Sequence, residues 1–518
     1  MRPYQSHEWA TIVDIIRTEA PWRPFPQVLA DADFMAAWLT AFASLEANRT
    51  LSKEALIAWW HSTQEYKDMH AKPVPVPDEP ETPPPAARPD TTLPLRVSPS
   101  KRWFMTDLGL FNWREFTAMS LLSHWMQGRQ AHVAAWMARA ASKRVTILRC
   151  AGSLGGPYWS DTARALTGLD LTIPNTPETF TAARELTQEA ARHGLKVRWF
   201  IFGDLHELLP DADAVSFEDW RDRRDVVDGH PHRQTALMRY AETFVRALTF
   251  ENNVIWEVAN EFKNIGFSRS EAFLWRVVDM IRREDPDAMV NLSGIDGADW
   301  HDPKFSRRPA TYVSAHISRD TGVFWTEWIK RSGEAAVIDS KEMNRDHHQL
   351  EDMPFDSGEP CNFGDLRRDG RNGDVCQSEM AAFAAAAHSR ARKHVMCFHH
   401  DDGLWCMGWG PDTDRCLDAF NAGLDAIPMS DDRVWRGHWA EAPFRADAFP
   451  TTDDVRAVEK FIQDGRGAFR AVGVGNRGVM FPIRADKDIS SFVKGPGVEV
   501  LDERRDSNNM KAVAFRVR

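Results

Sequence analysis

The chain has 518 residues, 43% of them hydrophobic, and a net charge of −11, which together predict two or three domains with real hydrophobic cores. Acidic residues are interleaved among the basic ones, which argues against the clustered basic surface that nucleic-acid binding requires. No apolar run approaches the roughly 20 residues of a membrane helix, and the first residues lack the pattern of a secretory signal.

Residues 1–70 are expected to form a small helical domain, because apolar residues recur at helical spacing in Trp9–Ile16 and Phe34–Leu45. Residues 71–100 are expected to be a Pro-rich linker that is extended and semi-rigid, because proline lacks the backbone donor and favours polyproline II. The alternative for the linker is a ligand for a proline-recognising domain. A spacer implies that residues 1–70 dock onto a larger protein assembly, such as a virion or a surface complex. We expect cytoplasmic synthesis followed by incorporation into that assembly.

Residues 101–440 alternate between apolar strand-like runs and amphipathic stretches. This alternation predicts an α/β fold, the (β/α)8 TIM barrel. A doubly wound sheet is not supported, because no Gly-rich turn follows the first strand. The eight expected strands are Trp103–Leu108, Val145–Cys150, Val197–Phe202, Val254–Val258, Met289–Leu292, Tyr312–His316, Ala335–Ser340 and Val395–His399. Residues 441–518 are expected to form a small C-terminal β-rich module, because short strand-like runs alternate there with Gly/Asn turns.

The segment Val254–Phe262 is the most informative part of the chain. It begins as a buried strand, the fourth in the predicted barrel, and ends in the pair Asn260-Glu261. Period-2 alternation places Glu257 and Glu261 on one face. Glu257 is therefore expected to be a buried, hydrogen-bonded residue of the barrel interior. Glu261 is expected to emerge at the rim as a proton donor, with Asn260 beside it to donate to a substrate hydroxyl.

A second carboxylate is expected at the end of the seventh predicted strand. Within Ala336–Asn344, alternation places Glu342 on the same face as Ser340 and sends Asp339 to the other side. We therefore select Glu342 as the partner of Glu261. The competing acids lie on less strand-like segments: Glu334, Glu351 and Glu359.

These motifs resemble the clan A glycoside hydrolases, in particular the cellulase-like family 5 group. In that clan an Asn-Glu pair closes strand 4 with the Glu as acid/base, and a Glu closing strand 7 is the nucleophile. The resemblance therefore gives these roles to Glu261 and Glu342. It also implies substrate-binding roles at positions that match singly, namely Arg149, His206, Asn260, His316 and Trp405.

The resemblance implies retaining hydrolysis of an O-glycosidic bond in a poly- or oligosaccharide, with two carboxyl groups about 5–5.5 Å apart. The negative charge of Glu342 favours the protonated form of Glu261. Neither a cofactor nor a metal is expected. The alternative hypothesis is a barrel that binds carbohydrate or serves a structural role without catalysis. The 21 Trp against 5 Tyr fit either core packing or stacking on sugars.

Two smaller features leave alternatives open. His399-His400-Asp401-Asp402 has metal-ligand residue types, but adjacent side chains of an extended segment point in opposite directions, so hydrogen bonding is preferred. Cys361 and Cys376 flank a polar loop and could pair in an oxidising compartment, whereas free thiols are the default for the six cysteines.

Overall fold

The structure is a computed structural model of the whole chain. It describes residues 58, 93–99, 103–156, 163–164, 167–211, 226–260, 262, 266–267, 269–296, 313–316, 348–354, 379–391, 395–399, 403, 405–406, 409, 411–429, 438–439, 469–474, 476–482, 497–505 and 511–518. The chain separates into two compact units, Met1–Pro84 with Tyr158–Leu171, and Pro85–Pro157 with Thr172–Arg518. The features below belong to the second unit. Apart from Ala58, the expected helical domain 1–70 lies outside the described residues, as does the linker up to residue 92.

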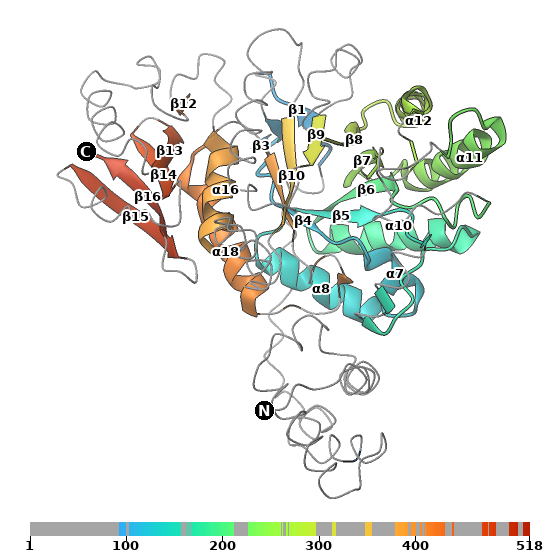
Figure 1. Ribbon diagram of the computed structural model, residues 1–518, viewed down its shortest axis with the longest axis horizontal. Helices are drawn as coiled ribbons and strands as arrows, with labels where there is room; N and C mark the ends of the chain where they lie inside the picture. The colour runs from blue at the N-terminus through green and yellow to red at the C-terminus, as the bar shows by residue number, and fades with distance from the viewer. Residues whose placement is uncertain are drawn as a thin grey trace, which may run out of the picture. The chain divides into compact units, whose positions relative to one another are not determined.

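Eight strands form a closed barrel in the spatial order β10-β11-β4-β5-β6-β7-β8-β9 (Figure 1). All eight pairings between neighbouring strands of this barrel are parallel. The predicted (β/α)8 class is therefore confirmed. The strands are β4 Glu115–Thr117, β5 Ile147–Ala151, β6 Lys196–Phe202, β7 Val254–Ala259, β8 Val290–Asp296, β9 Val313–His316, β10 His348–Pro354 and β11 Val395–His399.

Burial on both faces explains why the central strands were recognisable. All residues of β5 and β6, and all but the first residue of β7, are buried. Parallel strands covered by helices on the outside and side chains on the inside read as nearly continuous apolar runs. The charged residues that interrupt these runs therefore point to ion pairs inside the barrel.

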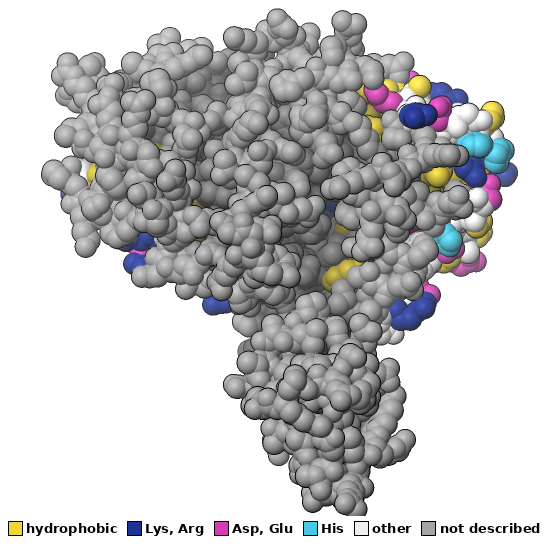
Figure 2. All heavy atoms as spheres, viewed as in Figure 1, with side chains coloured by type: hydrophobic (Ala, Val, Ile, Leu, Met, Phe, Trp, Pro, Cys, Tyr) yellow, Lys and Arg dark blue, Asp and Glu magenta, His cyan; other side chains and the backbone are white. Residues whose placement is uncertain are grey.

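Amphipathic helices cover the barrel. Proline at the first turn of α10 and α11 begins each helix where its missing N–H has no intrahelical partner anyway. Figure 2 shows acidic, basic and histidine side chains intermixed over α11 and α12, as on a solvated surface. The helices are α7 Leu121–Met126, α8 Gln130–Ser142, α10 Pro177–Arg192, α11 Pro231–Leu248, α12 Glu271–Glu284, α16 Glu379–Ala391 and α18 Pro411–Ala426. In the described part of the chain, none of the helices is long and apolar enough to span a membrane.

The expected first strand, Trp103–Leu108, is not a barrel strand. Its central residues form β2 Phe104–Thr106, which pairs antiparallel with β1 Arg96–Val97 and β3 Gly109–Leu110. Phe104 packs with residues that stand at or just before the starts of barrel strands, among them Ile147, Met289 and Val395. The small sheet thus caps the amino end of the barrel. An apolar capping strand and a barrel strand have the same local pattern, so this prediction was wrong.

The expected seventh strand, Ala335–Ser340, is also corrected. That segment lies outside the described residues, and β10 His348–Pro354 occupies the place between β9 and β11. The sequence of β10 is polar, so an apolar pattern favoured the earlier segment. The strand that pairs with β9 and β11 therefore carries Glu351, which the sequence ranked below Glu342.

The C-terminal part contains a five-stranded antiparallel sheet in the order β12-β13-β14-β16-β15. Helix α16 contacts both this sheet and the barrel strands β10 and β11 (Figure 1). The strands are β12 His438–Trp439, β13 Phe469–Val474, β14 Arg477–Pro482, β15 Val498–Arg505 and β16 Lys511–Val517.

Candidate active site

The residues singled out from the sequence are carried by five different barrel strands or by the segments directly after them. Because the strands are parallel, their carboxyl ends meet at one end of the barrel, where barrel enzymes place their chemistry. Arg149 lies on β5, His206 follows β6, Asn260 follows β7, His316 ends β9 and Trp405 follows β11. Glu261 and Glu342 lie outside the described residues, and only the backbone of His316 is described.

A buried ion network fills the barrel interior below Asn260. The Glu257 carboxylate on β7 accepts hydrogen bonds from Arg149 Nε (3.0 Å) and Nη2 (2.8 Å). It also forms an ion pair with Arg198 Nη2 (2.8 Å). Arg198, on β6, also reaches the Glu115 carboxylate on β4 at 3.2 and 3.3 Å. Each of the four side chains is at most 1% exposed. The expectation that Glu257 is a buried, hydrogen-bonded interior residue is confirmed.

The electrostatics of this network are set by burial and by mutual compensation. Burial raises the pKa of the Glu115 carboxyl above its ordinary value, and Arg198 and Arg149 oppose that rise. Trp113 Nε1 also donates to Glu115 Oε2 at 3.0 Å. Two arginines and two glutamates together carry no formal net charge, which is how charged groups can persist in a water-free interior.

Asn260 connects the ion network to the carboxyl end of the barrel. Its Oδ1 accepts a hydrogen bond from Arg149 Nη2 at 2.7 Å, and its backbone N–H donates to Phe202 O at 2.9 Å. The accepted bond fixes the orientation of the amide and turns the Nδ2 donors away from Arg149. The side chain and the backbone of Asn260, the residue before Glu261, are therefore both held in place.

His206 lies in the loop after β6. Its backbone N–H donates to Asp204 Oδ1 at 2.8 Å, which fixes the turn. The side chain is half-buried, and among the described residues its buried Nδ1 has no hydrogen-bond partner.

Trp405 is nine-tenths buried, and its loop is held by two histidines from the helices after β4. His124 Nε2 bonds to the Trp405 carbonyl at 2.8 Å, and His132 Nε2 bonds to the Cys406 carbonyl at 2.6 Å. A carbonyl only accepts, so both Nε2 atoms carry the proton. Arg129 Nη1 lies 2.9 Å from His124 Nδ1, which therefore accepts. Burial lowers the pKa of His124 to about 4.

The other tryptophan after β11, Trp409, is half-buried and packs against aromatic side chains. Its ring contacts Phe116 and Trp136, with centroids 5.3 and 5.0 Å apart, and its Nε1 donates to Asp414 Oδ1 at 2.7 Å. Trp409 thus serves packing outside the barrel strands, whereas Trp405 remains the candidate for sugar contact.

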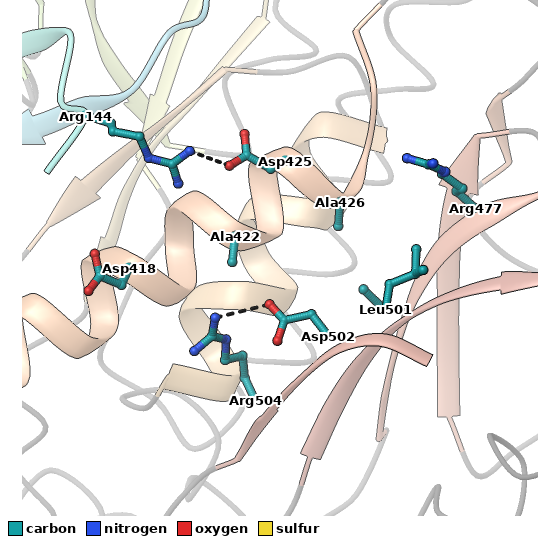
Figure 3. Close-up of a pocket in the computed structure, with 10 residues that line it drawn as sticks. Arg144, Asp418, Ala422, Asp425, Ala426, Arg477, Leu501, Asp502 and Arg504 are labelled. Carbon is teal, nitrogen blue, oxygen red and sulfur yellow. Dashed lines mark hydrogen bonds and ion pairs between the residues drawn. The ribbon is translucent and has the colours of Figure 1, made fainter. Parts of the chain in front are cut away.

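A pocket of about 470 Å³ lies between α18 and the C-terminal sheet (Figure 3). Its charged lining residues compensate one another, since Arg144 pairs with Asp425 (2.6 Å) and Arg504 with Asp502 (3.1 Å). Arg144 precedes β5, and Arg114, which also pairs with Asp425, directly precedes β4. The pocket therefore lies by the amino ends of the strands, where barrels carry stability rather than chemistry.

Neither metal nor disulfide chemistry is supported by the residues that are described. Among them, no three His, Cys, Asp or Glu side chains come close enough to hold a metal ion. Four cysteines, at positions 150, 397, 406 and 416, are buried free thiols. Cys361 and Cys376 lie outside the described residues.

Sequence reasoning missed Glu115, Arg198, His124 and His132. Arg198 had a readable signal, because it interrupts the otherwise apolar run of a confidently predicted strand. Glu115 lies on a three-residue strand, which is too short for a periodic pattern. The two histidines act through contacts with residues 281 and 274 positions away, which local patterns do not encode.

Comparisons with known proteins give structural matches alone, since no family model and no curated protein matches the sequence. A glycoside hydrolase family 5 mannosidase from Rhizomucor miehei aligns with a TM-score of 0.46 and 10% identity over 64% of this chain and 98% of its own. A glycoside hydrolase family 5 protein from Bacteroides vulgatus aligns at 0.45 and 10%, over 82% and 93%. A β-1,4-D-mannanase from Cryptopygus antarcticus aligns at 0.40 and 10%, over 65% and 96%.

Proposed function

We propose that the protein is a retaining glycoside hydrolase that cleaves O-glycosidic bonds of a poly- or oligosaccharide. The observation that carries the proposal is the fixed position of Asn260 at the carboxyl end of β7, held by Arg149 Nη2 at 2.7 Å. The next residue in the chain is Glu261. An anchored Asn-Glu pair at this end of a parallel barrel is suited to acid/base chemistry on a bound sugar.

The mechanism uses two carboxyl groups in two steps. Ionised Glu342 attacks the anomeric carbon while protonated Glu261 gives its proton to the departing oxygen, so that one sugar leaves as an alcohol. Glu261 then removes a proton from water, and that water displaces Glu342 from the anomeric carbon. Asn260, His206, His316 and Trp405 contact the sugar, the last as a flat apolar platform.

Glu351 is the competing nucleophile. It lies on β10, where it is the register partner of His316 on β9. Glu342 is supported by the resemblance described above, whereas Glu351 is supported by its place on the strand that lies between β9 and β11. The two assignments predict different inactive variants.

The test is turnover by Glu261→Ala, Glu342→Ala and Glu351→Ala on a panel of β-1,4-linked glucans, mannans and xylans, with product sizes measured. Loss of turnover in Glu261→Ala and Glu342→Ala, with retention in Glu351→Ala, supports the proposal. Added azide should restore a glycosyl azide of inverted configuration in Glu342→Ala, because the small anion takes the place of the missing carboxylate. If the wild-type protein binds sugar but hydrolyses none of these glycans, the result would favour the hypothesis of a non-catalytic barrel.

We further propose that residues 1–70 dock the enzyme onto a larger assembly through the linker 71–100. Support comes from the proline content of the linker, which favours an extended spacer. Deleting residues 1–92, which spares β1 of the capping sheet, should leave glycosidase activity intact and abolish incorporation into the assembly. Loss of activity in a soluble, folded deletion variant would refute the docking role.

A further inference from the structure

Two charged residues inside the barrel have no part in the mechanism above. Arg198 on β6 and Glu115 on β4 are both fully buried, and their side chains meet at 3.2 Å. Burying such a pair costs desolvation that an apolar pair of similar volume does not. A stability role alone is therefore a weak explanation, and the contacts of the pair indicate another.

The pair is connected to the candidate catalytic end by an unbroken chain of contacts. Glu115 binds Arg198, Arg198 Nη2 binds Glu257 Oε2 at 2.8 Å, and Glu257 binds Arg149 through two hydrogen bonds. Arg149 Nη2 then holds Asn260 Oδ1 at 2.7 Å. Each step joins a planar carboxylate or amide to a guanidinium, which has fixed donor directions.

Arg198 helps to set the position of Glu257, because it binds a carboxylate oxygen that Arg149 binds as well. Arg149 and Arg198 are register partners on β5 and β6, so two guanidinium groups lie side by side on one face. Glu257 Oε2 is shared between Arg149 Nε and Arg198 Nη2. Removing Arg198 frees the carboxylate to rotate, and the rotation would carry Arg149 away from Asn260.

We propose that Arg198 and Glu115 are positioning residues for the acid/base group, acting through Glu257, Arg149 and Asn260 on the turn that carries Glu261. The inference rests on the proposed function, because it assumes that Glu261 is the proton donor. It adds two residues that do not touch the substrate and that affect the reaction by placing that donor.

The chemistry of the first step separates a positioning role from a structural one. The carbon–oxygen bond breaks as Glu342 bonds to the anomeric carbon, and the departing oxygen takes the proton of Glu261 when it is a poor leaving group. A leaving group that is stable as an anion departs without that proton. Displacement of Glu261 therefore slows poor leaving groups and spares good ones, whereas general destabilisation slows both.

The experiment compares kcat/KM for 2,4-dinitrophenyl and 4-methoxyphenyl β-mannosides and β-glucosides, because this ratio reports the first step. The main variant is Glu115→Leu with Arg198→Met, which removes one ion pair and leaves the Arg149–Glu257 pair intact. We expect at least a tenfold loss on the methoxyphenyl glycoside and less than a twofold change on the dinitrophenyl glycoside. Arg198→Lys keeps the positive charge but loses the planar guanidinium that binds two carboxylates at once. It should show a smaller loss of the same kind, and it replaces the double variant in the test if that variant does not fold.

The matched control is Arg114→Met with Asp425→Asn, which removes an ion pair near the amino end of the barrel. It should leave the ratio between the two substrates unchanged. Equal losses on both substrates in the main variant, or no loss on either, would overturn the positioning role. Glu261→Ala is the reference variant. If its loss of kcat/KM is the same for both leaving groups, Glu261 is not the proton donor, and the proposed function itself is refuted.

Discussion

His124 gives the clearest link between a described contact and a measurable pH effect. Its Nδ1 faces Arg129, its ring lies 5.4 Å from that of His132, and its Nε2 bonds to the Trp405 carbonyl. Protonating Nδ1 would place a new N–H against a guanidinium in a buried site. Burial first, and then electrostatic repulsion from Arg129 and from the neighbouring imidazole, lower the pKa of His124 to about 4, while the Trp405 hydrogen bond opposes the shift.

The sign follows from where the proton goes. Between pH 6.5 and about 4 the unfolded chain takes up a proton at His124 and the folded protein does not. His124 therefore does not change the free energy of unfolding above pH 6.5, and it lowers that free energy progressively as the pH falls from 6.5 to about 4. At 1.36 kcal/mol per pKa unit, the difference amounts to about 3 kcal/mol.

The perturbation is His124→Gln, which keeps an N–H for the Trp405 carbonyl and cannot titrate. Urea unfolding at pH 7 and at pH 4.5, followed by far-UV circular dichroism, measures the change in the free energy of unfolding. The wild-type protein should lose about 2–3 kcal/mol more than His124→Gln over this interval. The control His232→Gln alters a histidine whose side chain is 68% exposed, and it should behave as the wild type. Equal pH dependence in wild type and His124→Gln would refute the reasoning.

Three further predictions concern single contacts. Gly403→Ala should lower the free energy of unfolding by about 1–3 kcal/mol in thermal or urea unfolding, because a Cβ would overlap the Thr117 carbonyl and the Phe116 ring; unchanged stability would show that the loop can shift. Asn291→Leu should leave the free energy of unfolding unchanged or raise it by about 1 kcal/mol, because both amide atoms are buried and have no partner among the described residues; a loss would reveal a bound water or another partner. Arg149→Lys should reduce kcat/KM at least tenfold, because lysine cannot bind Glu257 and Asn260 together; full activity would exclude a role for the fork.

The sequence predicted the class of fold because the barrel strands and helices have strong local patterns. The run Val254–Val258 is buried between sheet neighbours and helices, and β7 forms there as expected. One of the amphipathic stretches between the expected strands forms α12 Glu271–Glu284. In both cases the periodic pattern itself reports burial, so local sequence is sufficient.

The local sequence pattern did not predict the place of a strand in the fold where that place depends on residues distant in the sequence. The apolar segment Trp103–Leu108 caps the barrel, and the barrel strand is the short β4, whose Glu115 is stabilised by Arg198 from β6. For the seventh strand, the polar β10 takes the place that the pattern gave to Ala335–Ser340. The place of β10 in the barrel is set by backbone pairing with β9 and β11. Backbone pairing does not require apolar side chains, so an apolar pattern in the sequence does not reveal it.

The candidate site was predictable to a similar degree. Arg149 and Asn260 were both selected from the sequence, and the structure brings them into hydrogen-bond contact. Glu257 was expected to be buried and hydrogen-bonded, and it is. Its second guanidinium partner, Arg198, was not expected, because a charge inside an apolar run does not name its counter-ion.

The central claim is that Glu261 and a second glutamate perform double displacement, and trapping the covalent intermediate tests it most directly. A 2,4-dinitrophenyl 2-deoxy-2-fluoro-β-glycoside of the preferred sugar should accumulate on the enzyme, because fluorine at C2 slows both steps and the good leaving group restores only the first. Mass spectrometry of the digested protein should then find one sugar on the peptide that contains Glu342. A sugar on Glu351 would move the nucleophile to β10, and the absence of any adduct in an enzyme that turns over glycans would contradict the retaining mechanism.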